Sequence, residues 1–342
     1  MSIDLDSVKK ILIIQYQPFG DVLLNTGYLP VLRRKFPDAQ IDFLVRKPYD
    51  IIMKNNPHID ETITFRNGQG ISYFTERLKL IKRIRTKKYD VVIDQIRNTG
   101  SAQITLFSGA RYRLGFTDKR WKSLYNYGVP RKNVRYYSAL KFDVLEPLGI
   151  KEEPHELFYY IEDESMVYVN KWLKQENLKP GQFVCFSPGS PVKTKQWNLK
   201  NYAGLGDRIV SELQMPLVVL WAPKELKDAQ NVQSLMKEKS ILAPSTTFNQ
   251  AAAMLKNCTL LICNDGGLNH LSVATGTPSI ALFGKHGPRR WSPVIFENHF
   301  HFHKKNNNYR NDNTFGITVD EVFVTARNVL LKTAGGKAES DE

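Results

Sequence analysis

One short segment of the chain places an aspartate, two glycines and a histidine within six residues, directly after an apolar run. The run Cys258–Cys263 ("CTLLIC") is typical of a buried strand, and 268–275 ("LNHLSVAT") has helical apolar spacing. Asp265, Gly266 and Gly267 therefore fall at a strand-to-helix turn. Free backbone amides at such a turn favour an anion. A second interpretation stays open at this point, in which Asp265 only caps the helix.

Two other loops carry charged or hydroxyl side chains after an apolar run. Beyond the strand expected to end at Ser187, Ser190 lies in a Pro-Gly-Ser turn, and Lys193 and Lys195 precede the next helix. These groups suit a phosphate, or they form a cationic surface loop. Glu225 follows the run "PLVVL", where it could contact a ribose or a base, or begin a helix.

In the first half of the chain, Asp21 follows Gly20 soon after the strand expected at 10–16 ("KILIIQY"). Ligands of parallel α/β sheets bind at the carboxyl ends of strands. A carboxylate at this position could remove a proton from a bound hydroxyl, or it could cap the helix that follows. The glycine spacing is not G-x-G-x-x-G, so no dinucleotide site is predicted.

The elements that must position these loops alternate between apolar runs and amphipathic helices. The first half is expected to have strands at 10–16, 40–45, 61–65, 89–95 and 112–116, and helices at 20–36, 77–88, 101–110 and 136–150. After a weak region that includes a short strand-like run at 157–161, the alternation restarts and ends in a helix at 318–333. This order predicts parallel sheets covered by helices on both faces.

The same alternation in both halves predicts an α/β protein of two Rossmann-like domains that face each other across a cleft. We expect the domains at 1–165 and 166–333, followed by a disordered polar tail at 334–342. The 342 residues contain no apolar run of membrane-spanning length and no secretory signal at the start. The three cysteines lie in apolar runs, as buried thiols of a reducing compartment do, so a cytoplasmic location is expected.

The net charge of +14 indicates an acidic partner, such as nucleic acid, an anionic membrane face or an acidic substrate. The expected helix at 77–88 has a basic face that is either solvated or rests on anionic lipid. No zinc-finger, RNA-recognition or helix-turn-helix signature is present, so no nucleic-acid partner is predicted. The three histidines of 299–303 have no further ligand nearby, so no metal site is predicted.

Three segments together resemble, in order and separation, the signatures of glycosyltransferase family nine, the ADP-heptose:lipopolysaccharide heptosyltransferases. They are "FGDVLLNTGYLPVLRRKFPDAQIDFLV", "SPGSPVKTKQWNLKNYAGL" and "CNDGGLNHLSVATGTPSIALFG", and the match runs from about Lys10 to Pro293. The resemblance implies a GT-B fold whose first domain binds the acceptor and whose second domain binds the nucleotide sugar. It also implies an inverting transfer that needs no metal and no cofactor.

Carried over residue by residue, the resemblance implies that Asp21 is the general base and that Lys195 contacts the donor phosphates. The family's D-x-G-x-x-H donor loop matches Asp265, Gly267 and His270, and Ser190 lies in its phosphate turn. The family often has threonine where this chain has Gly266, so one hydroxyl contact to phosphate is absent here. On charge and placement, the donor residues also include Lys193 and Glu225, and the acceptor residues are expected to be Arg97, Arg111, Arg113 and Arg120.

The predicted protein is a heptosyltransferase that moves a heptose from ADP-heptose to a Kdo or heptose of the lipopolysaccharide inner core. It is expected to be peripheral on the cytoplasmic face of the inner membrane, with an anionic membrane surface as partner. Two alternatives stay open: a transferase of the same fold that uses a different sugar nucleotide, and a non-catalytic GT-B-like binding protein.

Overall fold

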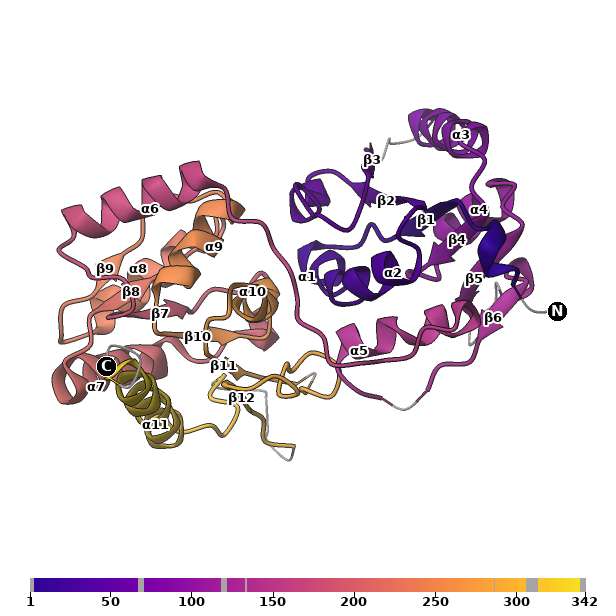
Figure 1. Cartoon of the computed structure of the whole chain (residues 1–342). Helices are drawn as coiled ribbons and strands as arrows, with labels where there is room; N and C mark the ends of the chain where they lie inside the picture. The colour runs from indigo at the N-terminus through magenta and orange to yellow at the C-terminus, as the bar shows by residue number, and fades with distance from the viewer. Residues whose placement is uncertain are drawn as a thin grey trace. The chain divides into compact units, whose positions relative to one another are not determined.

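Figure 1 shows the computed structural model of the chain, which describes residues 3–66, 71–117, 122–132, 134–285, 287–305 and 313–338. The chain divides into two compact units, Met1–Tyr160 and Ile161–Glu342. Each unit is built on one six-stranded sheet. The division precedes the boundary expected at 165, so helix α6 (Asp163–Gln175) belongs wholly to the second unit.

In the first unit, all neighbouring strands are parallel, in the order β3-β2-β1-β4-β5-β6. The sheet consists of β1 (Lys10–Ile14), β2 (Gln40–Arg46), β3 (Glu61–Phe65), β4 (Val91–Asp94), β5 (Tyr112–Phe116) and β6 (Tyr127–Val129). The helices are α1 (Phe19–Leu23), α2 (Leu29–Lys35), α3 (Ile71–Thr86), α4 (Thr99–Phe107) and α5 (Tyr137–Lys141). This is the Rossmann strand order, which reverses between β1 and β4.

The second unit repeats this topology, with all-parallel strands in the order β12-β11-β10-β7-β8-β9. Its strands are β7 (Val184–Ser187), β8 (Leu217–Val219), β9 (Ile241–Leu242), β10 (Leu260–Asn264), β11 (Ser279–Leu282) and β12 (His299–Phe302). Its helices are α6, α7 (Leu199–Leu213), α8 (Leu226–Leu235), α9 (Phe248–Asn257), α10 (Gly267–Thr275) and α11 (Val319–Ala338). Here the order reverses between β7 and β10, the first and fourth strands of the unit.

Burial of the sheets explains why their strands are apolar runs instead of alternating patterns. β4, β7, β10 and β11 are buried along their whole length, because helices cover both faces of a parallel sheet. In the first unit, Leu80 and Ile84 of α3 pack on Leu12, Ile14 and neighbouring strand residues. The expectation of parallel α/β sheets is confirmed, and the three cysteines are buried free thiols, as predicted.

The prediction of one continuous helix at 20–36 is wrong. The structure has α1 and α2 separated by a 3-10 turn at Thr26–Tyr28. Asn25 Nδ2 donates to the carbonyl of Asp21 at 2.6 Å, and Thr26 Oγ1 donates to the carbonyl of Leu23 at 2.7 Å. These side chains compete with the helical backbone bonds and end α1 early.

Three more elements differ from the expectation. The helix expected at 136–150 is α5 followed by a 3-10 segment at Asp143–Leu148, in which Pro147 supplies no amide donor. No strand forms at 157–161; instead, the Phe158 amide donates to Thr26 Oγ1 at 2.9 Å. The expected tail is helical up to Ala338, and 339–342 lie outside the described residues. None of the helices in the described part of the chain has both the length and the apolar character needed to cross a membrane.

Candidate active site

The first cluster of site residues lies at the carboxyl edge of the first sheet, where the strand order reverses. Asp21 is in the first turn of α1, which follows β1, and Arg97 follows β4. The Asp21 side chain is half-buried. Burial raises the pKa of this carboxyl group, and the charge of Lys141 opposes the rise. Asp21 is therefore a partly desolvated carboxylate at the position where ligands of this fold bind.

Lys141 is a site residue that the sequence analysis missed. Its side chain is buried, Nζ donates to the carbonyl of Gln95 at 3.0 Å, and Nζ lies 5.0 Å from the centre of the Tyr137 ring. Burial lowers the pKa of Lys141 to about 8, and the Asp21 charge works against that decrease. A single lysine on the apolar face of "YSALKFDVL" was the signal available in the sequence.

Two arginines complete this cationic edge. The guanidinium groups of Arg97 and Arg131 lie 5.3 Å and 5.7 Å from the centre of the Phe116 ring. Arg131 Nη2 also donates to Tyr137 Oη at 2.9 Å. Both charges help to lower the pKa of Lys141, so the three cations lie within electrostatic reach of one another. Arg131, which follows β6, was not predicted; Arg97 was.

The structure does not bring the other predicted arginines to this edge. Arg111 directly precedes β5 and stacks on the Tyr112 ring at 5.0 Å, at the amino end of the sheet. Arg113 donates from Nη1 to the Ala110 carbonyl at 3.1 Å and from Nε to the Leu124 carbonyl at 3.0 Å. Both lie toward the amino end of β5, whereas Asp21 follows the carboxyl end of β1, so the fold does not support their assignment to the acceptor. Arg120 lies outside the described residues.

The second cluster lies where the strand order of the second sheet reverses, after β7 and β10. Lys195 Nζ pairs with Asp265 Oδ2 at 2.6 Å, and the Asp265 side chain is buried. The residue that caps α10 is Gly266, and no side chain caps this helix. Asp265 is therefore not the helix cap. It holds an ammonium group beside a helix start whose N-cap residue, Gly266, has no side chain to bond the first amides.

The glycines of this loop leave space in front of the helix. Gly266 has an extended backbone that any residue adopts, and a Cβ on Gly267 would meet no atom within 4 Å. Neither glycine is thus required by backbone strain or by packing within the protein. Their absent side chains keep the first amides of α10 accessible, which suits an anionic group.

Asn264 joins the two loops and was not predicted as a site residue. Its Nδ2 donates to the carbonyls of Pro188 and Gly189 at 2.9 and 3.1 Å, and its Oδ1 accepts from the Trp197 amide at 2.9 Å. Trp197 is fully buried, and its Nε1 donates to the Thr314 carbonyl at 2.9 Å. This buried network fixes the segment that carries Lys195 against the end of β10.

A close contact between Gly284 and Thr194 also holds the segment that carries Lys195 in place. A Cβ on Gly284, which follows β11, would lie 2.4 Å from the carbonyl oxygen of Thr194. Only glycine leaves room for this backbone contact. The glycine beside Lys285 therefore serves packing against the Lys195 segment.

His270 lies on α10 in the same region. It is buried, and its ring centre is 6.0 Å from that of Trp291. Burial and, to a smaller extent, the charge of Lys195 lower its pKa to about 3. The imidazole is thus neutral at physiological pH and can take part in hydrogen bonds, but it adds no charge to the site.

The remaining predicted donor residues lie on the loop after β7 or beside it. Ser190 Oγ donates to the Val192 carbonyl at 3.0 Å and closes its own turn. Lys193, 68% exposed, pairs with Asp228 at 3.1 Å and so points its ammonium toward α8. Glu225 packs on Gly189, where a Cβ would lie 2.5 Å from Glu225 Oε2. Burial raises the Glu225 pKa.

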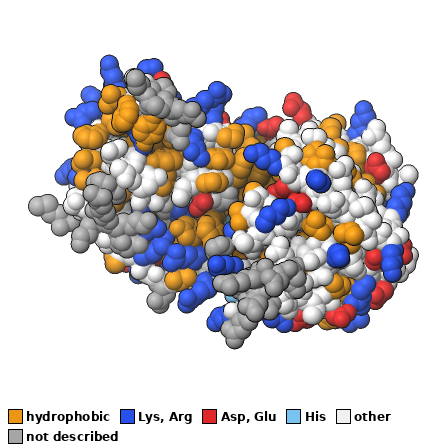
Figure 2. Space-filling view, turned by 180° about the vertical axis from the view of Figure 1, so that it is seen from behind, with side chains coloured by type: hydrophobic (Ala, Val, Ile, Leu, Met, Phe, Trp, Pro, Cys, Tyr) orange, Lys and Arg blue, Asp and Glu red, His pale blue; other side chains and the backbone are white. Residues whose placement is uncertain are grey.

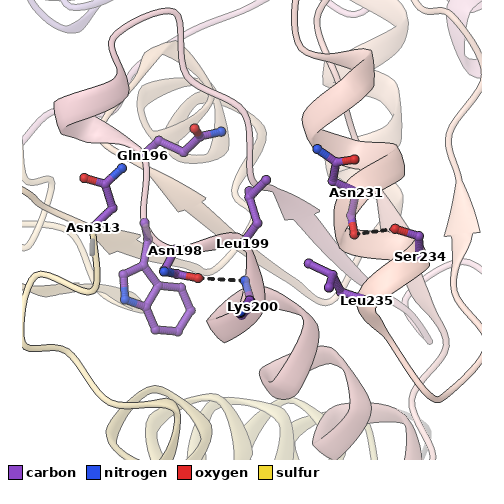
Figure 3. A pocket seen from close by; sticks show the side chains of 9 residues that line it. Gln196, Asn198, Leu199, Lys200, Asn231, Ser234, Leu235 and Asn313 are labelled. Carbon is purple, nitrogen blue, oxygen red and sulfur yellow. Dashed lines mark hydrogen bonds between the residues drawn. The ribbon is translucent and has the colours of Figure 1, made fainter. Parts of the chain in front are cut away.

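A pocket of about 400 Å³ is lined by Gln196 and Trp197, which directly follow the Lys193–Lys195 turn (Figure 3). Its lining is neutral apart from Lys200: Gln196, Trp197, Asn198, Leu199, Asn231, Ser234, Leu235 and Asn313. The Asn198 side chain caps α7 by accepting from the Lys200 amide at 2.8 Å. None of the candidate donor residues lines this pocket.

Two histidines of β12 form hydrogen bonds with different serine side chains. His299 Nδ1 shares a hydrogen bond with Ser279 Oγ at 2.9 Å, and His301 Nδ1 shares one with Ser292 Oγ at 2.7 Å. Among the residues that the structure describes, no three histidine, cysteine or acidic side chains come together as metal ligands.

Two Rossmann-type units in one chain, each with candidate site residues at its strand-order reversal, have the architecture of the GT-B fold. The sequence model of glycosyltransferase family 9 (heptosyltransferase) matches residues 77–313. The chain therefore belongs to glycosyltransferase family 9, the heptosyltransferases, and it is an enzyme. The resemblance found in the sequence is confirmed.

A relative of known family agrees with this assignment, and two solved structures share the fold. Lipopolysaccharide heptosyltransferase 2 of Escherichia coli K12 is 26% identical over 301 residues, which cover 83% of this chain and 85% of the relative. The fold matches a glycosyl transferase family 9 structure from Veillonella parvula DSM 2008 (TM-score 0.85, 24% identity, 97% and 99% coverage). It also matches E. coli heptosyltransferase WaaC with ADP-2-deoxy-2-fluoro heptose (TM-score 0.73, 17% identity, 93% and 99% coverage).

Proposed function

We propose that this enzyme transfers a heptose from ADP-heptose to a Kdo or heptose residue of the lipopolysaccharide inner core. The observation that carries the proposal is the Lys195–Asp265 pair beside the uncapped start of α10, at the strand-order reversal of the second sheet. Family membership and the activity named for the E. coli relative support the choice of substrates.

The proposed reaction is an inverting displacement. Asp21 takes the proton of an acceptor hydroxyl, and the hydroxyl oxygen attacks the anomeric carbon of the donor. The bond between that carbon and the diphosphate oxygen breaks, and ADP leaves with the bonding electrons. Lys195 and the first amides of α10 stabilise the negative charge that develops on the diphosphate. A fixed cation and oriented amides in this position support a reaction without a divalent metal.

The acceptor side is proposed to bind anionic sugars. Arg97 and Arg131 lie within electrostatic reach of Lys141, whose charge acts on Asp21, so this edge holds three cations beside the two carboxylates Asp21 and Asp94. Carboxylates and phosphates of an inner-core oligosaccharide complement this excess. The net charge of +14 favours the anionic cytoplasmic face of a membrane on which such an acceptor is displayed.

A donor panel tests the proposed function. ADP-heptose, other ADP-sugars and UDP-sugars are offered with truncated lipopolysaccharide acceptors, in EDTA, and products are identified by mass spectrometry. We expect transfer from ADP-heptose only, to Kdo- or heptose-terminated acceptors, at a rate that EDTA leaves unchanged. Transfer from another nucleotide sugar would assign a different donor, and strict dependence on Mg²⁺ or Mn²⁺ would exclude the metal-free reaction.

Lys141 gives a pH-dependent prediction. Its charge lowers the pKa of Asp21. In Lys141→Met the Asp21 pKa rises, so a higher pH is needed to ionise the base, and the acid limb of the kcat/KM profile moves to higher pH. The matched control is Lys35→Met, an exposed lysine of the same unit. An unchanged acid limb in a variant that melts like the wild type would show that Lys141 does not tune Asp21.

A further inference from the structure

Helix α3 presents large apolar side chains to solvent on the first unit. Phe74 and Leu78, one helical turn apart, are each 67% exposed. Phe107, the last residue of the neighbouring helix α4, is 49% exposed, and its carbonyl accepts from Arg85 of α3 at 3.3 Å. The opposite face of α3 supplies Leu80 to the core. We call the exposed side chains of 73–88 and Phe107 the α3–α4 surface.

The α3–α4 surface is strongly basic as well as apolar. Residues 73–88 contain one acidic side chain, Glu76, and many basic ones: Arg77, Lys79, Lys82, Arg83, Arg85, Lys87 and Lys88. Three of the cations are paired: Lys79 with Glu76 at 2.9 Å, Arg83 with Glu61 at 3.1 Å and Lys87 with Asp42 at 3.2 Å. Figure 2 shows, at the upper left over α3, apolar side chains bordered by lysine and arginine.

The amino-terminal half of this surface begins beside the edge that carries Asp21. Tyr16 lies in the loop between β1 and α1, and its Oη donates to Asn98 Oδ1 at 2.9 Å. The charge of Arg77 in α3 reaches the same tyrosine side chain, where it opposes the rise in the Tyr16 pKa that burial causes. Within the first unit, the surface and the proposed base are thus joined through one short loop.

We propose that the α3–α4 surface docks on an anionic lipid bilayer. Phe74 and Leu78 enter the interface between headgroups and acyl chains, and the lysines and arginines contact lipid phosphates. An exposed leucine and phenylalanine between cations gain free energy from acyl chains, whereas nucleic-acid phosphates would need the cations alone. The inference deepens the proposed function and rests on it in one respect: an acceptor held in a bilayer would be presented to the edge that carries Asp21.

Vesicle flotation of the full chain tests the docking surface. The probes are vesicles of phosphatidylglycerol with phosphatidylcholine, and vesicles of phosphatidylcholine alone. We expect binding to the anionic vesicles, weakened by high salt. We test two double variants, Phe74→Ser/Leu78→Ser and Lys79→Glu/Lys82→Glu. Each should reduce the partition coefficient at least about tenfold, because the first removes the apolar contribution to vesicle binding and the second removes the electrostatic contribution.

Helix α6 of the second unit supplies matched controls. Val167 is 67% exposed, like Phe74 and Leu78, and Lys171 and Lys174 are exposed lysines. Val167→Ser and Lys171→Glu/Lys174→Glu should leave vesicle binding within about twofold of the wild type, since α6 lies outside the docking surface. Equal losses in the α3 and α6 variants would show non-specific attraction and overturn the proposal.

Transfer measurements distinguish a failure of the docking surface from a failure of the proposed function. Transfer to a water-soluble, delipidated acceptor should be unchanged in both α3 variants. Vesicle binding by a protein that transfers no heptose would refute the proposed function and leave the docking surface intact. Undiminished binding of Phe74→Ser/Leu78→Ser to anionic vesicles, or binding of the wild type to duplex or single-stranded nucleic acid but not to vesicles, would refute the docking surface.

Discussion

Asp21→Asn is expected to lower kcat by about 10²–10⁴-fold, the range that a general base contributes, while ADP binding stays within about twofold of the wild type. The amide keeps the shape of the side chain but cannot accept the proton of the acceptor hydroxyl. The Asn25 hydrogen bond that ends α1 goes to the backbone carbonyl of residue 21, so the variant retains it. Initial rates with ADP-heptose and a truncated acceptor, together with calorimetric titration of ADP, measure the two quantities.

Two further variants make the test of Asp21 specific. Asp38→Asn changes an exposed aspartate of the same unit and should have full activity. Asp21→Asn also removes the negative charge that favours protonated Lys141. At saturating acceptor, the double variant Asp21→Asn/Lys141→Met should therefore have a kcat no lower than that of Asp21→Asn, whereas loss of the Lys141 charge should raise KM for the anionic acceptor. Turnover near the wild-type value in Asp21→Asn would eliminate this residue as the base.

Lys195→Met has the second largest expected effect. The ammonium group is the fixed cation proposed to stabilise the leaving diphosphate, and loss of one such stabilising group costs about 10²–10³-fold in kcat. Because the lysine would also contact the ground-state donor, KM for ADP-heptose should rise as well. Lys193→Met is the comparison: its ammonium is paired with Asp228 and Gln196, so its loss should cost less than about tenfold.

The Lys195–Asp265 pair allows catalysis to be separated from stability. Removal of Lys195 leaves the buried Asp265 carboxylate without its cation, which should cost about 1–3 kcal/mol of unfolding free energy. Lys195→Met/Asp265→Asn removes the uncompensated charge and should recover that stability, as measured by urea denaturation. Activity should not recover with it. Recovery of both would show that Lys195 acts only by keeping the loop folded.

Local sequence patterns by themselves were sufficient to locate the loops that hold the candidate site residues. In a parallel α/β chain, every loop that follows a strand lies at the carboxyl edge of its sheet, so short apolar runs were sufficient to place Asp21, Lys195 and Asp265 at such edges. The same rule could have excluded Arg111, since a residue that precedes a strand lies at the opposite edge. The breaks in the helices expected at 20–36 and 136–150 came from side-chain bonds and a proline whose effect periodicity does not show.

Only the tertiary structure decided which groups act on one another. The charge of Lys141 acts on the Asp21 carboxyl group from 120 residues away in sequence, and Lys195 pairs with Asp265 from 70 residues away. Asn264 ties the Pro188–Trp197 segment to the end of β10 in the same way. Sequence patterns report the secondary structure of each segment. Electrostatic interactions and hydrogen bonds depend on distance and burial, which are fixed only when segments far apart in the chain pack together.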